Sequence, residues 1–334
     1  MSEAEVNARA LAEGPAEPTP SVFIMGAGVV GTALAARLVR AGVPVTGLHG
    51  RQVEPTDAAR ALPGGVGGGV GVGVVVRSTG EIPDILSESD AVIIAVRDDR
   101  VPEVAERLAR EGRLRREQIL LHASGANPAR TILAAALPYV RAVGTLHPLV
   151  SFADARVAIE GLGEVAFGIE GDEPARALAK RIVRALGARA VILEAENLAL
   201  YHAGAVMASN YVVALADTAR SLLVKAGVPA DQALPVLIPL LASVVQNLAQ
   251  VGLPGALTGP VERGDVVSIE RHLDTLAERA PEVIELYRLV GRDVLRLARE
   301  KSKMDPASAA RLEALFSGPA PTAPAGACGR DPGA

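Results

Sequence analysis

The sequence contains no tryptophan, only four phenylalanines and four tyrosines, and one cysteine among 334 residues. With aromatic residues at 2%, it lacks the stacking platforms that bind single-stranded nucleic acids. Its one cysteine, Cys328, excludes an internal disulfide and a cysteine-based metal site. A formal net charge of −4 gives no electrostatic attraction to nucleic acid or to an anionic membrane. We therefore expect a protein of the reducing cytoplasm that binds no metal and no nucleic acid.

The sequence also lacks a hydrophobic leader and an uninterrupted membrane-spanning run. Residues 1–20 are acidic and have no apolar core of the signal-peptide type. Residues 198–216 and 232–261 contain no Asp, Glu, Lys or Arg, but polar residues interrupt the first stretch and Pro235, Pro239 and Pro254 break the second. We expect buried helices of a soluble core or of a subunit interface here, and no membrane span.

Apolar residues make up 49% of the chain, enough for two domains with cores. From Val22 to about Leu193, short β-branched runs alternate with helical segments, which predicts βαβ units and a mostly parallel sheet. After Glu194 only Ala/Leu-rich helical patterns follow. We expect an α/β domain over 21–193, an all-helical domain over 194–316 for substrate binding and dimerisation, and disordered tails at 1–20 and 317–334.

A glycine-rich insert, GGVGGGVGVGVVV, occupies residues 64–76. Its valine-rich end is predicted to form the third strand, and its glycine-rich start is predicted to be an expanded loop. A phosphate-binding role is the alternative, although no helix start follows the glycines directly.

The segment VFIMGAGVVGTALAARLVRAG, residues 22–42, joins a strand to a helix through a glycine loop. In this context Gly26 permits a tight turn, Gly28 lets the backbone approach a pyrophosphate, and Gly31 lets helix and strand pack closely. The arrangement predicts a Rossmann-like dinucleotide site. The expected contacts are the six loop residues Gly26, Ala27, Gly28, Val29, Val30 and Gly31.

The end of the next predicted strand selects the cofactor. It reads LHGRQ, with His49 at its end, Arg51 just beyond it, and no acidic residue before Glu54. A guanidinium suits a 2′-phosphate, and no carboxylate is present to bind a free 2′-hydroxyl. We expect NADP(H), with Val96, Arg97 and Asp98 delivered to the cofactor's edge by a third strand end; the alternative for Arg51 is a solvated surface side chain.

Two further strand ends carry groups suited to proton transfer. Ser124 follows the run QILLHA, and His147 lies in GTLHPLVSF. Hydride transfer to a carbonyl or imine leaves a group that needs a proton, which a hydrogen-bonded serine or a histidine can supply. A hydrogen-bonded turn histidine is the alternative for His147. For His122 a buried, satisfied histidine is the favoured interpretation.

The segment 196–219 is predicted to be one helix with a polar stripe. At about 100° per residue, His202 and Ser209 lie within about 20° of each other, and Asn210 is offset by about 80°. The stripe faces either a substrate cleft between the domains or a helix–helix interface.

Five segments, taken together, resemble one family: GAGVVG at 26–31, HASGA at 122–126, GTLHPLVSF at 144–152, YHAGAVMASNY at 201–211 and LTGPVERGD at 257–265. That family joins a Rossmann-like domain to a C-terminal domain of unknown function 2520, countable from about residue 145. The resemblance covers about residues 21–300 and extends to the broader group of 6-phosphogluconate dehydrogenase, ketopantoate reductase and pyrroline-5-carboxylate reductase. It implies NADP(H) use and homodimers whose helical domains pack together.

The resemblance to catalytic residues is partial. Hydroxyacid dehydrogenases and ketopantoate reductase use a lysine and a nearby asparagine of the second domain; this sequence has Asn210, but Val206 and Met207 stand where the lysine would lie. LHPLVSF is similar to the His-Pro-Met-Phe-Gly stretch of prephenate and arogenate dehydrogenases, which implies that His147 contacts the reacting hydroxyl and Ser124 is an active-site serine. Arg263 is a candidate contact for an anionic substrate.

We therefore expect an NADP(H)-dependent oxidoreductase for a small carbonyl, hydroxy or imine substrate, bound between the domains. The expected reacting-centre residues are His147, Ser124, His202 and Asn210. A substrate like prephenate is an alternative. The missing lysine supports a second hypothesis, a non-catalytic NADP-binding sensor or scaffold.

Overall fold

The computed structural model describes residues 20–50, 76–151, 165–301 and 304–318. The tails predicted at 1–20 and 317–334 lie almost entirely outside these residues, as does the glycine-rich insert except for Val76. Val76 begins a short strand, β3, so the predicted third strand starts at the last residue of the insert.

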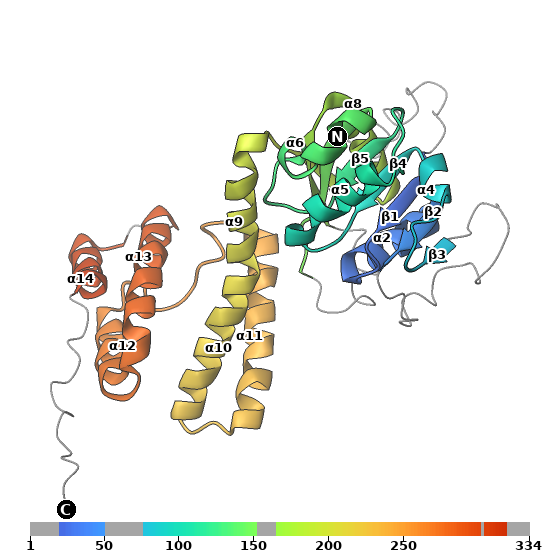
Figure 1. The fold of residues 1–334 in the computed structure, drawn as a ribbon. Helices are drawn as coiled ribbons and strands as arrows, with labels where there is room; N and C mark the ends of the chain where they lie inside the picture. The colour runs from blue at the N-terminus through green and yellow to red at the C-terminus, as the bar shows by residue number, and fades with distance from the viewer. Residues whose placement is uncertain (1–19, 51–75, 152–164, 302–303, 319–334) are drawn as a thin grey trace, which may run out of the picture. The chain divides into compact units, whose positions relative to one another are not determined.

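An eight-stranded sheet forms the core of the N-terminal half, in the order β3-β2-β1-β4-β5-β6-β7-β8 (Figure 1). The strands are β1 (Val22–Met25), β2 (Val45–His49), β3 (Val76–Ser78), β4 (Ala91–Ile94), β5 (Ile119–His122), β6 (Ala142–Pro148), β7 (Ala166–Gly171) and β8 (Arg189–Ile192). All pairings are parallel except that of β6 with β7. The first six strands have the order of a dinucleotide-binding Rossmann fold, which confirms the predicted fold class.

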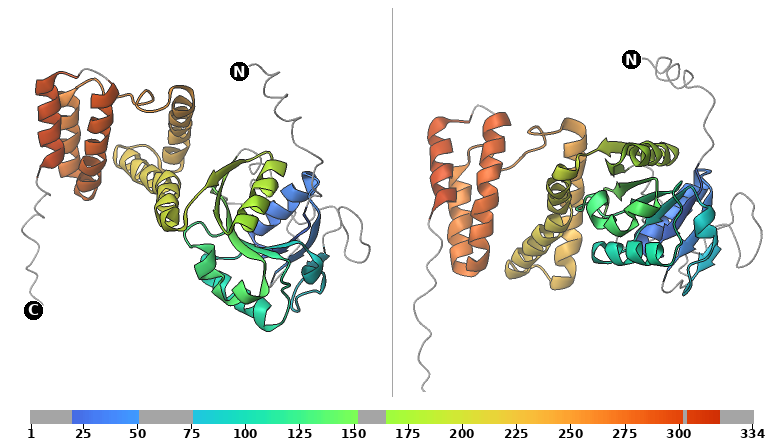
Figure 2. Two further views of the ribbon diagram at one scale, coloured as in Figure 1. Left: turned by 90° about the horizontal axis from the view of Figure 1, so that it is seen from above. Right: turned by 45° about the horizontal axis from the view of Figure 1, so that its top comes forward.

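Helices cover both faces of this sheet (Figures 1 and 2). They are α2 (Val29–Arg40), α4 (Ile85–Glu88), α5 (Val101–Arg110), α6 (Ala129–Ile132) and α8 (Glu173–Ala185). Because neighbouring strand residues point to opposite faces, Ile24 and Ile93 pack with α2 and α8, whereas Phe23 and Val92 pack with α4, α5 and α6. Strands β1, β4 and β5 are buried on both faces, as their continuous apolar runs require, whereas β8 at the edge of the sheet is exposed.

The carboxyl ends of the parallel strands form one row. Met25, Ile94, His122 and Thr145 are consecutive register partners across β1, β4, β5 and β6. The chain beyond β1, β4 and β5 therefore leaves the sheet at a common edge, and β6 continues past the row and carries His147 beyond it. Ligands of open parallel sheets bind at this edge.

The chain divides into two compact units, Met1–Ser209 and Asn210–Ala334. The first unit includes α9 (Leu198–Ala208), which the sequence analysis assigned to the helical domain. A hydrogen bond from α9 to β6, between Tyr201 and His147, is one of the contacts that join this helix to the sheet.

The second unit is helical throughout its described residues, as expected. It contains α10 (Asn210–Lys225), α11 (Ala230–Val251), α12 (Val266–Arg279), α13 (Ile284–Lys301) and α14 (Pro306–Ser317). Ile269, Leu295 and Phe316 belong to its core, in which α12, α13 and α14 pack together. Gly291 allows the closest contact, because a Cβ atom there would lie 2.4 Å from the ring of Phe316.

Two helical stretches remain largely uncovered within the chain. Ala195–Lys225 and Ala230–Val251 are long and apolar enough to cross a membrane, judged by length and composition alone. In their most apolar 18-residue windows, 6% and 0% of residues are buried. Among the described residues these stretches are therefore not buried core helices, and the subunit interface expected for them stays a prediction.

Candidate functional site

The glycine loop between β1 and α2 has the geometry of a phosphate cradle. Gly26 has φ +127°, and a Cβ atom there would lie 2.2 Å from the carbonyl oxygen of Ala95. A Cβ atom on Gly31 would lie 1.8 Å from the carbonyl oxygen of Gly26, so both positions need glycine. Gly28, by contrast, has open space where its Cβ would be, which leaves the backbone at the start of α2 accessible to a ligand.

A cavity of about 880 Å³ lies over this loop. Its walls come from the ends of β1, β2, β4 and β5 and from α5. The predicted cofactor residues among its lining are Gly26, Ala27, Gly28, Val29, Val30, His49, Val96 and Arg97. Gly31 packs against the loop, and Arg51 lies outside the described residues. The cavity is of ligand-binding size, and an open loop backbone at a helix start fits the pyrophosphate of a dinucleotide; these contacts stay predictions.

Ser124 follows β5 and is hydrogen-bonded to Asp98, in the segment after β4, and to Asn127. Its hydroxyl donates to Oδ2 of Asp98 at 2.8 Å and accepts from Nδ2 of Asn127 at 3.1 Å. Ser124 is almost fully buried, whereas Asp98 is exposed and lines the cavity. A buried hydroxyl thus directs its proton to a carboxylate in contact with solvent.

His147 lies near the end of β6 and is half-buried. Its Nδ1 is 3.1 Å from the hydroxyl oxygen of Tyr201, and the His202 ring stands edge-on with a centroid distance of 6.0 Å. The pKa of His147 is lowered to about 4, mainly by burial and then by the charge of His202, against an opposing effect of Asp98. His147 is therefore neutral at pH 7 and is within electrostatic reach of Asp98.

Tyr201 fixes this histidine from α9. Its ring meets that of His147 edge-on, with centroids 5.7 Å apart. A Cβ atom on Gly168 would lie 2.7 Å from the Tyr201 hydroxyl, so the glycine in β7 makes room for it. Burial raises the pKa of Tyr201, against a smaller opposite effect of a hydrogen bond from the Gly168 backbone.

His122 is a buried structural residue, which is the interpretation that the sequence favoured. Its Nδ1 accepts from the Ser124 backbone N–H at 3.2 Å, so its Nε2 carries the proton and donates to Oγ1 of Thr145 at 3.1 Å. Thr145 in turn donates to Glu170 at 3.0 Å. Burial, followed by the charge of His147, lowers the pKa of His122 to about 3. This chain of bonds ties the Ser124 backbone to a buried carboxylate.

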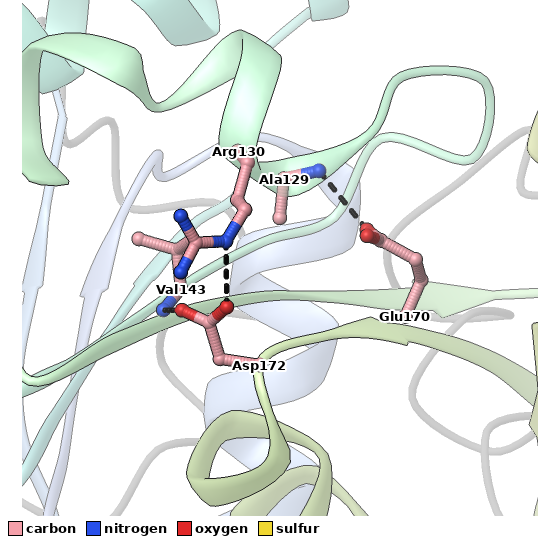
Figure 3. A network of polar contacts seen from close by, with 5 residues as sticks. All are labelled: Ala129, Arg130, Val143, Glu170 and Asp172. Atoms are coloured by element: carbon pink, nitrogen blue, oxygen red, sulfur yellow. Dashed lines mark hydrogen bonds and ion pairs between the residues drawn. The ribbon is translucent and has the colours of Figure 1, made fainter. Parts of the chain in front are cut away.

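Glu170 and its neighbour Asp172 connect the antiparallel strand β7 to the rest of the site (Figure 3). Glu170 accepts from the Ala129 N–H at 2.9 Å. Asp172 accepts from Arg130 at 2.8 Å and from the Val143 N–H at 3.1 Å. Both ends of the segment from Ser124 to Arg130 are therefore anchored to the sheet.

The predicted helix 196–219 is interrupted, so its polar residues do not form the single stripe that was predicted. α9 ends at Ala208 and α10 begins at Asn210, with Ser209 at φ −126° and ψ −78° between them. The Ser209 hydroxyl donates to the Ala205 carbonyl at 2.7 Å, a side-chain bond that bends helices. His202 lies beside His147, whereas Asn210 starts the second unit and its role stays a prediction.

Four groups that complete the site were not predicted from the sequence: Asn127, Thr145, Glu170 and Tyr201. Asp98 was expected at the cofactor's edge of the sheet, but not as the partner of Ser124. The other four are polar residues with no recognisable spacing. Within the described ranges, no three His, Cys, Asp or Glu side chains converge as a metal site.

Two family comparisons cover most of the chain. Residues 12–148 match the Rossmann-like domain. Residues 165–294 match the domain of unknown function DUF2520. The resemblance drawn from the five sequence segments is thereby confirmed. No match is found among proteins with curated descriptions.

Solved structures share the fold over nearly their whole length. A Bacteroides fragilis protein, whose suggested activity is that of an NADP oxidoreductase, has 23% identity and a TM-score of 0.61, covering 83% of this chain and 98% of its own. A Thermotoga maritima protein has 23% identity and a TM-score of 0.64, covering 84% and 99%. Pyrroline carboxylate reductase of Plasmodium falciparum, solved with NADP bound, has 12% identity and a TM-score of 0.55, covering 90% and 100%.

Proposed function

We propose that this chain, which carries a Rossmann-like domain followed by a DUF2520 domain, is an NADP(H)-dependent oxidoreductase for a small carbonyl, hydroxy or imine substrate. The observation that carries the proposal is the hydrogen bond between Asp98, which lines the dinucleotide-sized cavity, and the buried Ser124. It brings a proton-transferring pair to the wall of the cofactor cavity. The Bacteroides fragilis and Plasmodium falciparum proteins named above support the cofactor class.

The cofactor is held by the glycine loop and the strand ends. The loop N–H groups at the start of α2 bind the pyrophosphate, because an N-terminal helix end favours anions. His49, Val96 and Arg97 line the cavity, and His49 is proposed to contact the adenosine together with Arg51. When bound, the nicotinamide supplies or accepts the hydride.

Ser124 and Asp98 move the accompanying proton. In the oxidative direction the substrate hydroxyl gives its proton to Ser124 Oγ while the serine proton passes to Asp98, and reduction runs the same steps in reverse. The hydrogen bond from Asn127 to Ser124 leaves the serine proton directed at Asp98. Asp98 then exchanges the proton with solvent, because its side chain is exposed.

His147 orients the reacting oxygen as a neutral imidazole. With a pKa of about 4 it holds no extra proton at pH 7. Because the Gly168 backbone donates to the Tyr201 oxygen, the tyrosine proton is directed to Nδ1 of His147, and Nε2 keeps its hydrogen. That N–H can donate to a carbonyl oxygen and polarise it. His202 borders the same ring, and Asn210 is proposed as a further substrate contact.

We further propose that a second copy of the chain covers the apolar faces of α10 and α11, and that the dimer is cytoplasmic. Val213 and Val245 are 71% and 67% exposed, and apolar patches of this kind mark interfaces. Gln246, Asn247 and Gln250 interrupt α11 with polar groups, which disfavours a lipid environment.

Light scattering after detergent-free gel filtration tests the dimer. We expect a dimer for the natural sequence and a monomer for Val245→Asp. Val267→Asp, 61% exposed on α12, is the control and should remain dimeric. A protein that stays in solution only with detergent would contradict both the dimer and its cytoplasmic location.

The activity test combines binding with a substrate screen. NADPH titration should show binding, and thermal-shift measurements with NADPH and a panel of keto acids, imines and hydroxy acids should identify a ligand that raises the melting temperature. Ser124→Ala and His147→Ala should then lower turnover by about 100-fold or more while NADPH affinity stays the same. Turnover that survives both substitutions would overturn the proposed site, and NADPH binding without any reaction across the panel would favour a sensor.

A further inference from the structure

The cavity has a positively charged side chain, Arg107 of α5, in its lining. β2 ends at His49, which lines the same cavity. The two side chains are close enough to interact: the pKa of His49 is lowered first by burial and then by the positive charge of Arg107. The guanidinium therefore acts on the space at the end of β2.

The structure fixes Arg107 in this position. Its Nε donates to Oε1 of Glu111, one turn further along the chain, at 2.8 Å. Its Nη2 donates to the Gly80 carbonyl at 3.0 Å, in the segment that follows β3. A guanidinium has five N–H groups, so these two bonds hold one edge of it and leave further donors for a ligand.

The position has a known meaning in dinucleotide folds. A carboxylate at the end of the second strand binds the free 2′-hydroxyl of the adenosine ribose, whereas a nearby arginine accommodates a 2′-phosphate. Here the last residues of β2 are Leu48 and His49, followed by Gly50. Glu111 is the acidic group beside Arg107, and its Oε1 is engaged by the guanidinium.

We propose that Arg107 is a specificity-determining residue of this chain, which binds the 2′-phosphate of NADP(H) at the end of β2 beside His49. The inference rests on the proposed dinucleotide function. It differs from the sequence prediction because the arginine comes from the helix after β4 and not from the chain that follows β2. A planar fork that is already held by two bonds loses little freedom when it binds a phosphate.

Calorimetric titration of the full chain with 2′,5′-ADP and with 5′-ADP tests this without a known substrate. The natural sequence should bind 2′,5′-ADP at least about tenfold more tightly, a difference of about 1.4 kcal/mol. Arg107→Met should remove this preference and leave 5′-ADP affinity within about twofold. Arg110→Met changes the same net charge on the same helix, outside the cavity lining, and should keep the preference.

The outcomes separate the two proposals. An Arg107→Met variant that still prefers 2′,5′-ADP overturns the role of Arg107, as does equal binding of both nucleotides by the natural sequence; either result leaves the dinucleotide site standing. Absence of any nucleotide or NADPH binding overturns the proposed function itself. Arg107→Lys keeps the positive charge but loses the planar guanidinium, so it should retain only part of the preference for 2′,5′-ADP. If Arg107→Met fails to fold, an Arg107→Lys protein with the full natural preference contradicts the proposal.

Discussion

The face of the His147 imidazole covers Gly125, so closely that a Cβ atom on the glycine would lie 2.7–2.8 Å from three ring atoms. The glycine is part of the segment that also carries Ser124. Ser124, one of the two groups proposed to act on one oxygen, is therefore next in sequence to the glycine on which the other, His147, packs.

Gly125→Ala should therefore displace the His147 ring while the fold survives. Adding a methyl group to a packed site costs about 1–3 kcal/mol, and we expect a loss of stability in that range. NADPH affinity should stay within about twofold, since Gly125 is not among the residues that line the cavity. The ring ¹⁵N and ¹H signals of His147 should shift in NMR spectra.

Gly204→Ala is the matched control, because a Cβ atom on this α9 glycine would meet nothing within 4 Å. It should leave the His147 signals in place. Unchanged His147 signals in Gly125→Ala would show that the ring does not pack on the glycine.

Tyr201→Phe should change the tautomer of His147 without removing the aromatic contact. The substitution deletes only the hydroxyl that lies 3.1 Å from Nδ1, so Nδ1 loses its partner and the two neutral tautomers mix. The ¹⁵N shifts of the ring nitrogens should move toward each other, with a stability loss of about 1 kcal/mol.

A second histidine–tyrosine pair in the helical unit provides the control. His272 and Tyr287 are joined at 2.9 Å with rings edge-on. Tyr287→Phe should move the signals of His272 and not those of His147. If both substitutions leave His147 unchanged, Tyr201 does not set its tautomer.

The fold could be predicted from the sequence because its signals are local. The run VFIM buries all four residues in β1, and Gly26 and Gly31 have the tight turn and the close packing that their spacing predicts. Such assignments depend on alternation, glycine geometry and strand length, which act within about twenty residues.

The site was predictable only where one residue type is informative by itself. His147 and Ser124 could be singled out because few residues carry their chemistry. Asp98, Tyr201 and Glu170 reach the site through pairings across 26, 54 and 25 positions, and nothing in their neighbours predicts those contacts. The helix break at Ser209 also escaped prediction, since a serine in a uniform apolar pattern gives no sign that its hydroxyl bonds the preceding turn.

Stability should fall in mild acid because two histidines are buried in the neutral form. The pKa values of His147 and His122 are about 4 and about 3 in the folded chain, against 6.5 ordinarily. Below pH 6.5 the unfolded chain binds these protons and the folded chain does not, so the contribution is complete above pH 6.5 and is lost as the pH falls toward 4. Each histidine adds a slope of up to about 1.4 kcal/mol per pH unit.

Urea unfolding at pH 7.5, 6 and 5 measures this slope, and His147→Gln separates the two residues. The variant should lose less stability between pH 6.5 and pH 5 than the natural sequence does, by up to about 1.4 kcal/mol per unit. The observed difference should be below that limit because His147 is only half-buried. Parallel curves for the two proteins would contradict the burial of a neutral His147.

Asp98→Asn should break the proton route while keeping its geometry. The amide oxygen still accepts from Ser124, but it cannot hold the proton that the serine passes on. With the substrate identified by the screen above, turnover at pH 7 should fall by about 100-fold or more, and NADPH affinity should stay within about threefold. Asp99→Asn, one residue away in an exposed pair with Arg97, removes the same charge from the same turn and should keep near-natural turnover. Equal activity in the two variants would mean that solvent or His147, and not Asp98, exchanges the proton with Ser124.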